Sequence, residues 1–182
     1  MVIVKMKQRI RQLIYIILLV AIDQITKYWA STTLKGNEPI TIIPKVLKFQ
    51  YHENTGAVWG ILSGKTDFLT IFTVVLVIIL LFIYFKIPRT KRHLAIQILW
   101  VFILSGAIGN FIDRVSLKYV VDFIYFELID FPIFNIADSY LTVSCVVLFI
   151  LGIFYYKEED FDFVDNIFKK SKKENDNDES NE

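Results

Sequence analysis

Four long apolar stretches constrain the fold of this chain more than any other feature of its sequence. A helix that crosses the ~30 Å hydrocarbon core of a bilayer needs roughly 17 to 25 mostly apolar residues. The stretches that meet this requirement are Leu13–Ala30, Phe68–Phe85, Leu94–Ile112 and Ser139–Tyr156. We therefore expect an all-α integral membrane protein with four transmembrane helices.

The composition supports a membrane protein and excludes several other classes. Apolar residues make up 54% of the 182 positions, charged residues make up 21%, and the mean hydropathy is +0.48. Soluble domains average about 45–50% apolar and about 25% charged residues. A net charge of +1 gives no basis for nucleic-acid binding. One cysteine and two histidines cannot form a disulfide framework or a Cys/His zinc site, so we expect no metal and no cofactor.

The distribution of Lys and Arg predicts the orientation, because cytoplasmic connections retain basic residues. Thirteen basic residues lie in the N-terminus, the loop after the second stretch and the C-terminal tail, against six in the other two connections. Both termini are therefore expected to be cytoplasmic. A secretory signal peptide also begins with a basic segment, but no small-x-small cleavage pattern follows here, so we expect the first helix to remain. Residues 1–156 then form one membrane domain, and residues 157–182 form a charged, flexible tail.

The two connections on the opposite side are long and have a distinct character. In residues 31–67, the β-prone runs 40–44 and 46–52 are expected to pair as short strands, with a turn following at 54–56. Residues 57–62 contain Trp59 and are expected to form a short interfacial helix. The second connection, residues 113–137, is unusually apolar and is expected to lie on the membrane surface. The sequence thus predicts a small extracytoplasmic β-rich cradle beside the helices.

Six ionisable residues lie near the outer ends of the predicted helices or in the second outer connection: Asp23, Lys27, Asp113, Arg114, Asp122 and Asp138. Ionisable groups at membrane depth are costly, usually face a cavity or one another, and mark function. The predicted topology places all six at one depth. We therefore expect them to converge.

Two groups of these residues have structural as well as functional interpretations. Asp23 and Lys27 are four residues apart and share one helix face. They either belong to a site or form a structural pair in which Lys27 extends to the interface. The third helix presents a stripe of four residues. In it, Gly106 allows close helix packing, and the adjacent charges of Asp113 and Arg114 favour a scaffolding pair. That stripe consists of Gly106, Asn110, Asp113 and Arg114.

The remaining two carboxylates indicate chemistry. Asp122 has only apolar neighbours, whereas Asp138 opens the fourth helix, where capping alone would favour an aspartate. Two carboxylates in a dry site cannot both ionise and therefore share a proton. One can then deprotonate a water while the other protonates a peptide carbonyl oxygen. Serine or cysteine chemistry is poorly supported, because neither histidine is placed to serve the single Cys145.

Five blocks, in this order, resemble the bacterial lipoprotein signal peptidase family (signal peptidase II). The resemblance covers roughly residues 10–156 and includes the four-span layout of the family. The tail after Tyr156 lies outside it. The blocks are Asp23-Gln24-Ile25-Thr26-Lys27, Asn54-Thr55-Gly56-Ala57-Val58-Trp59-Gly60, the segment from Gly106 through Gly109-Asn110-Phe111-Ile112-Asp113-Arg114, Val120-Val121-Asp122-Phe123 and Phe134-Asn135-Ile136-Ala137-Asp138.

The resemblance implies an activity and a set of roles. It implies an intramembrane aspartic endopeptidase of the bacterial cytoplasmic membrane that cleaves prolipoproteins before a diacylglyceryl-modified cysteine and is inhibited by the cyclic peptide globomycin. Asp122 and Asp138 correspond to the catalytic dyad, near the outer leaflet. Asn54 either binds substrate backbone or serves a plain turn. The supporting positions that match are Asp23, Lys27, Asn54, Gly106, Asn110, Asp113, Arg114, Asn135 and Ala137.

Two other classes of membrane protein compete with a peptidase. A small ion or proton transporter also contains buried charges, but here they gather on one side, and the second and fourth helices carry no charge through their middle. A structural membrane subunit would leave Asp122 unexplained. We therefore expect a peptidase, with membrane lipids and lipid-modified prolipoproteins as its partners.

Overall fold

The computed structural model describes residues 2–56 and 64–164 of the chain. These residues contain the helices α1 (Val2–Thr33), α2 (Thr66–Lys86), α3 (Leu94–Leu117) and α4 (Ile136–Phe154). All four are long and apolar enough to cross a membrane, which confirms the predicted fold class. The fourth begins earlier than expected, because Asn135 caps it, and it ends at Phe154. The interfacial helix expected at 57–62 and the end of the tail lie outside the described residues.

Helix α3 occupies the centre of the helical layer and packs against α1, α2 and α4. Its interior side chains, among them Val101 and Leu104, form one core with Ile16 of α1 and Leu80 of α2. By contrast, α2 and α4 leave most of their surface outside the protein. In a membrane protein such apolar surface faces lipid, so α3 is the helix best placed to carry polar groups away from it.

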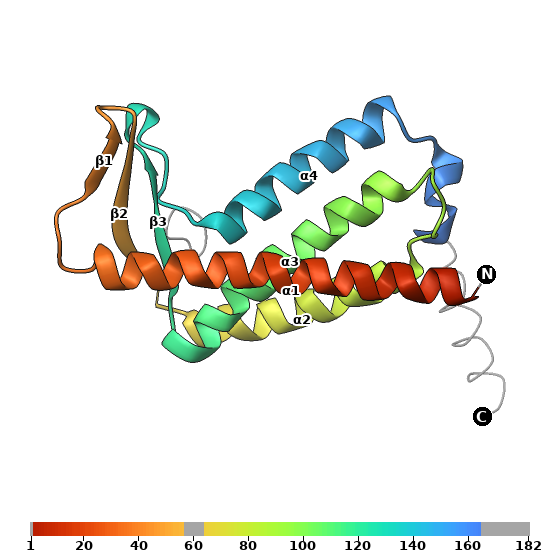
Figure 1. Ribbon diagram of the computed structural model, residues 1–182, viewed down its shortest axis with the longest axis horizontal. Coiled ribbons are helices and arrows are strands. Elements are labelled where there is room, and N and C mark those ends of the chain that lie inside the picture. Colours follow the sequence, from red (N-terminus) through yellow and green to blue (C-terminus); the bar gives the residue numbers. More distant parts are fainter. Residues whose placement is uncertain (1, 57–63, 165–182) are drawn as a thin grey trace.

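A three-stranded antiparallel sheet lies beyond one end of the helices (Figure 1). Its strands are β1 (Ile40–Ile43), β2 (Leu47–Asn54) and β3 (Val120–Phe126), in the order β1-β2-β3. The pairing of β1 with β2 was expected from the first outer connection. The sheet is carried by α1, which has 32 residues and at 1.5 Å per residue is ~48 Å long, well beyond the ~30 Å of a bilayer core.

The third strand corrects an expectation about the second outer connection. That connection was expected to lie on the membrane surface because it is apolar. Instead, Val121 and Phe123 of β3 are buried against Ala30 and Leu34 at the end of α1. Packing of the sheet against α1 therefore accounts for much of the apolar character of this connection. The short 3-10 helix that follows, η2 (Glu127–Ile129), does expose Leu128 and Ile129.

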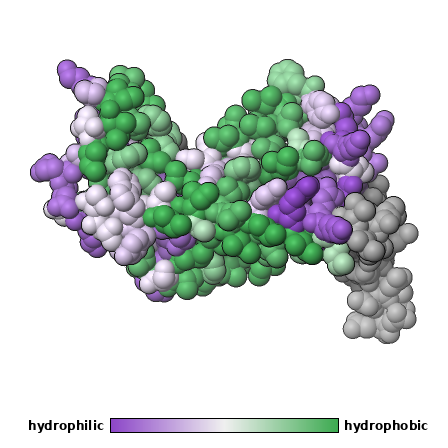
Figure 2. Space-filling model, viewed as in Figure 1, coloured by the Kyte–Doolittle hydropathy of each residue, from purple (hydrophilic) through white to green (hydrophobic). Residues whose placement is uncertain are grey.

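The polar ends of the molecule differ from its middle. On the face shown in Figure 2, hydrophobic surface covers much of the helices, while hydrophilic residues gather near the N-terminus and at the edge of the sheet. The N-terminus lies at the end of α1 opposite the sheet (Figure 1). A short 3-10 helix after α4, η3 (Glu158–Phe161), lies at that same end, where Asp160 pairs with Arg92.

Candidate active site

The polar residues predicted from the sequence do converge, at the end of the bundle that meets the sheet. They come from α1, β2, α3, β3 and the start of α4. Most are removed from solvent: Asp23 and Asn135 are 0% exposed, Asp122 is 1% exposed and Lys27 is 3% exposed. Lys27 therefore does not extend to the interface, and its structural alternative as a snorkelling residue is wrong.

Asn135 connects the two proposed catalytic carboxylates. Its side-chain oxygen accepts the N–H of Asp138 at 2.9 Å, and the Asp138 carboxylate accepts the N–H of Asn135 at 3.2 Å, which makes a reciprocal capping box. The Asn135 amide nitrogen donates to Asp122 Oδ1 at 2.7 Å. Asp138 thus does take part in capping the helix, as its alternative interpretation held, although Asn135 is the capping residue. The cap itself holds Asp122 beside it.

The register of the sheet brings Asn54 to the same carboxylate. The first half of the β2–β3 ladder pairs Phe49 with Ile124, a register that would place Asn54 opposite Tyr119 and on the face of Val121. A one-residue irregularity before His52 instead pairs Asn54 with Val120. Asn54 then shares a face with Asp122, and its amide donates to Asp122 Oδ2 at 2.9 Å. Both oxygens of Asp122 therefore accept a side-chain amide.

Lys27 lies at the centre of a buried charge cluster behind these carboxylates. Its Nζ lies 2.9 Å from Asp23 Oδ2 and 3.2 Å from Asp113 Oδ2, and it donates to Asn110 Oδ1 at 2.9 Å. Asn110 in turn donates to Asp138 Oδ1 at 2.7 Å and accepts from Asn135 at 3.1 Å. Only the amide of Asn110 thus separates Lys27 from Asp138. Each charge of the Lys27 cluster has a partner.

Two small residues of α3 allow α4 and α1 to come this close. A Cβ built on Gly106 would lie 2.5 Å from the backbone oxygen of Ala137, and one on Gly109 would lie 2.5 Å from Asp23 Oδ2. Asp23 also accepts the N–H of Ala137 at 2.9 Å. The carboxylate of Asp23 therefore joins α1 to the first turn of α4, where a helix N-terminus favours a negative charge.

The structure corrects the expected pairing of Asp113 and adds residues that sequence reasoning did not assign. Asp113 pairs with Lys27 and not with its neighbour Arg114, and it also accepts the backbone N–H of Val121 at 3.0 Å. Gln24 donates to Asp113 Oδ1 at 2.9 Å. Gln24 and Gly109 stood in the recognised sequence blocks, so a signal for both was available.

Arg114 is partly buried, and its guanidinium lies within electrostatic range of Asp113, Asp122 and Asp138. Among the described residues it forms no hydrogen bond or ion pair with any of these three. The side chain is thus a cation beside the site and not a brace within the Lys27 cluster.

The environment of Asp122 favours its protonated form. Burial, followed by the charge of Asp138, raises the pKa of Asp122 to about 7, although the amides of Asn54 and Asn135 act in the opposite direction. An aspartate that holds its proton near neutral pH can donate it to a developing oxyanion. Within the described residues, no group of three or more His, Cys, Asp or Glu side chains is arranged to hold a metal ion.

Comparison with known proteins identifies the class to which this fold and site belong. Residues 15–154 match the protein family described as Signal peptidase (SPase) II. The lipoprotein signal peptidase of Staphylococcus aureus (strain MRSA252) is 44% identical over 136 residues, which cover 74% of this chain and 82% of the relative. The protein of the same name from strain JH9 is 43% identical over the same shares.

Solved structures agree with the sequence relatives. A bacterial membrane enzyme determined by the in meso method at 2.3 Å resolution superimposes with a TM-score of 0.71 at 40% identity, over 81% of this chain and 92% of that chain. A second, at 1.9 Å resolution, gives 0.69 at 40% identity, over 80% and 94%. The chain belongs to the signal peptidase II family. It is therefore an aspartic endopeptidase of the membrane that acts in lipoprotein processing.

Proposed function

We propose that Asp122 and Asp138 form the catalytic dyad of this endopeptidase. The observation that carries the proposal is that Asn135 contacts both carboxylates: its side-chain nitrogen donates to Asp122, and its backbone N–H donates to Asp138. Two carboxyl groups held side by side by one residue, with Asp122 buried, form a pair that shares a proton. This is the arrangement that aspartic proteolysis needs.

The proposed reaction assigns a role to each carboxyl group. Asp122 carries the shared proton, because burial and the charge of Asp138 raise its pKa to about 7. Asp138 then takes a proton from water as the water oxygen bonds to the scissile carbonyl carbon, and Asp122 protonates the carbonyl oxygen. The tetrahedral intermediate collapses as the C–N bond breaks: one of its hydroxyl protons returns to Asp122, and the proton on Asp138 passes to the leaving amine.

The surrounding residues then act as positioning residues. Asn135 and Asn110 fix the carboxylate of Asp138, and Asn54 fixes that of Asp122. The Lys27 cluster with Asp23 and Asp113 holds α1, α3 and α4 together, and Gly106 and Ala137 provide the close helix contact. Arg114 supplies positive charge beside the dyad.

We propose that the substrate is a prolipoprotein cut before its diacylglyceryl-modified cysteine. The dyad lies where the apolar helices meet the sheet, at the boundary that a lipid-bearing cysteine would occupy. On the face in Figure 2, the surface is hollowed between the sheet and α4. The basic residues at the opposite end support cytoplasmic termini and a dyad near the outer leaflet.

The test of this substrate class is a cleavage assay on matched prolipoproteins in detergent or vesicles. The diacylglyceryl-modified substrate should be cleaved, with the modified cysteine as the new N-terminus by mass spectrometry, and globomycin should inhibit. The same precursor without the lipid should be cleaved at least tenfold more slowly. Equal rates on both precursors would contradict a requirement for the lipid while leaving the dyad intact.

A transporter is not favoured as the activity of this chain. The buried charges gather at one end of the bundle, and α2 carries no charge between Asp67 and Lys86. A proton or ion relay needs groups through the full depth of the membrane.

A further inference from the structure

A second polar centre lies at the opposite end of the bundle from the dyad. A cavity of about 560 Å³ opens between the first turns of α1 and the segment that leads into α3. Its lining residues are Lys7, Gln8, Arg11, Arg89, Thr90, Lys91 and Leu94. Four of the seven are cationic and none is acidic.

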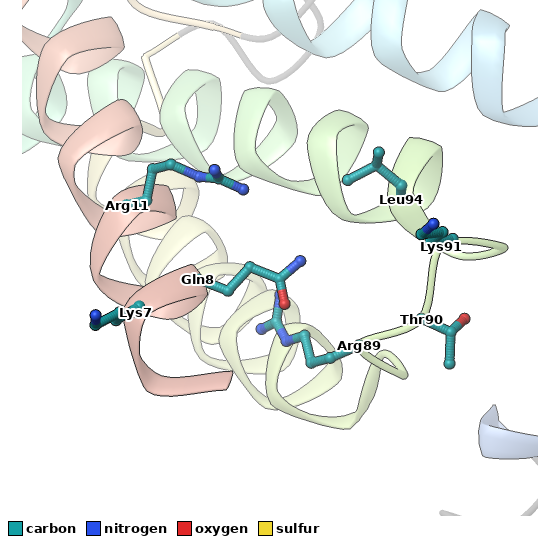
Figure 3. Close-up of a pocket in the computed structure, with 7 residues that line it drawn as sticks. All are labelled: Lys7, Gln8, Arg11, Arg89, Thr90, Lys91 and Leu94. Carbon is teal, nitrogen blue, oxygen red and sulfur yellow. The ribbon is translucent and has the colours of Figure 1, made fainter. Parts of the chain in front are cut away.

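The side chains of this cavity approach one space from two elements. Figure 3 shows Arg11 and Gln8 extending from α1, and Arg89 extending from the α2–α3 loop toward Gln8, while Lys7 points away. Lys91 stands on the far rim beside Leu94 (Figure 3). Arg11 and Arg89 are thus the two guanidinium groups best placed to meet one ligand.

Arg89 is held in place by neutral groups. Its guanidinium donates to Gln12 Oε1 at 2.5 Å and lies over the ring of Tyr84, 4.6 Å from the ring centre. Gln12 also receives the Tyr84 hydroxyl at 2.7 Å and donates to Gln97, which is 0% exposed. Buried glutamines inside apolar helices are costly unless they are hydrogen-bonded. Here they fix the guanidinium without cancelling its charge.

The charges of this cavity are not compensated by acids. Among the described residues, Arg11, Arg89 and Lys91 form no ion pair, whereas the neighbouring Arg92 pairs with Asp160 at 2.8 Å. The Nε of Arg89 is buried without a hydrogen-bond partner in the described part of the chain. A general bias of basic residues toward the cytoplasm explains charges at this end, but it does not explain a cavity built around an immobilised arginine.

We propose that this cavity binds the phosphate headgroup of an anionic phospholipid in the adjacent leaflet. Guanidinium groups match phosphate oxygens in a bidentate geometry, and basic pockets between helices at the cytoplasmic surface bind such headgroups. A free phosphate would need only the charges. A lipid also needs apolar surface next to them, and Leu94, which lines the cavity and is 43% exposed, provides it.

The test compares two double variants of the purified protein that lose the same charge. Arg11→Gln/Lys91→Gln removes two exposed cations that line the cavity. Arg9→Gln/Lys86→Gln removes two cations at the same end that lie over Phe85 and Phe82 and do not line it. Thermal stability and native mass spectrometry then report binding of phosphatidylglycerol, with phosphatidylcholine and soluble glycerol phosphate as comparison ligands.

The wild type and the Arg9/Lys86 variant should bind phosphatidylglycerol alike, with a raised Tm, and the Arg11/Lys91 variant should bind it at least tenfold more weakly. Phosphatidylcholine should give no comparable shift. Equal binding by the two double variants would overturn the site. A Tm shift from glycerol phosphate as large as that from phosphatidylglycerol at the same concentration would overturn its assignment to a lipid. Neither result depends on the proposed proteolytic reaction.

Discussion

The side-chain amide of Asn135 donates to Asp122 Oδ1 at 2.7 Å, so the residue that caps α4 also fixes a carboxylate on β3. One side chain therefore performs two separable tasks. Its oxygen satisfies the N–H of Asp138 at the helix start, and its nitrogen orients Asp122. A variant that retains the first task and loses the second distinguishes stability from catalysis.

Asn135→Ser should retain the cap and lose the bond to Asp122, because a serine oxygen accepts the helix N–H but does not reach across to β3 as an amide does. We expect Tm near that of wild type and kcat lower by about 10- to 100-fold. Asn135→Ala should also lose about 1 kcal/mol of stability. Full activity of Asn135→Ser at unchanged stability would show that the amide contact is dispensable.

Lys27→Met should strongly destabilise the fold, because it leaves Asp23 and Asp113 as buried carboxylates without a cation. Breaking a buried pair in this way costs about 3–5 kcal/mol. The matched control is Lys35→Met, which breaks the exposed pair with Glu53 and should change Tm little. Asp113→Asn added to Lys27→Met should recover part of the loss. A Lys27→Met protein as stable as the Lys35→Met protein would contradict the charge cluster.

Gly109→Ala should displace the carboxylate of Asp23, since its Cβ would lie 2.5 Å from Oδ2. We expect a loss of about 1–3 kcal/mol together with lower activity, both measured on the purified enzyme. Gly152→Ala is the control on α4, where no atom lies within 4 Å of the added Cβ. The Gly152→Ala variant should be as stable as wild type or slightly more stable. An equal loss of stability in both variants would rule out a specific contact between position 109 and Asp23.

The pH dependence of kcat/KM should follow the protonation of Asp122. Burial and the charge of Asp138 raise the pKa of Asp122 to about 7, and the Asn54 amide lowers it. Because Asp122 donates its proton, activity should be present below about pH 7 and fall above it. Removing the amide in Asn54→Ala should raise this pKa and move the alkaline limb to higher pH.

His52→Gln is the control for the pH profile, because His52 is exposed and lies opposite Asp122 in the ladder. Its alkaline limb should stay in place. If the alkaline limb moves in His52→Gln but not in Asn54→Ala, the limb does not report the protonation of Asp122.

Much of the fold followed from the sequence because hydrophobic length determines how many helices can cross a membrane. The convergence of Asp122 and Asp138 also followed, since topology placed them at one depth. Their joint contact with Asn135 did not, because it depends on a helix cap meeting a strand from another part of the chain. The predicted partner of Asp113 was wrong for a related reason. Sequence adjacency favoured Arg114, whereas helix packing brings Lys27 to Asp113.

Two further features needed the folded chain. The contact between Asn54 and Asp122 depends on a one-residue shift in the β2–β3 register, and a single strand gives no signal of its partner's register. In sequence, β3 resembled an apolar loop on the membrane surface. Burial of a strand against a helix and contact with lipid favour the same residue types. Gln12 and Gln97 did carry a signal, as amides within apolar helices, but their partners come from separate elements.

The most direct test of the account is cleavage of a diacylglyceryl-modified prolipoprotein by Asp122→Asn and Asp138→Asn, each with its Tm measured. Asn preserves the size of the side chain but cannot act as the acid or base. Both variants should fold and lose cleavage by at least about 1,000-fold, while Asp67→Asn, at an exposed aspartate, should cleave like wild type. Retained cleavage in either dyad variant would contradict the proposed mechanism.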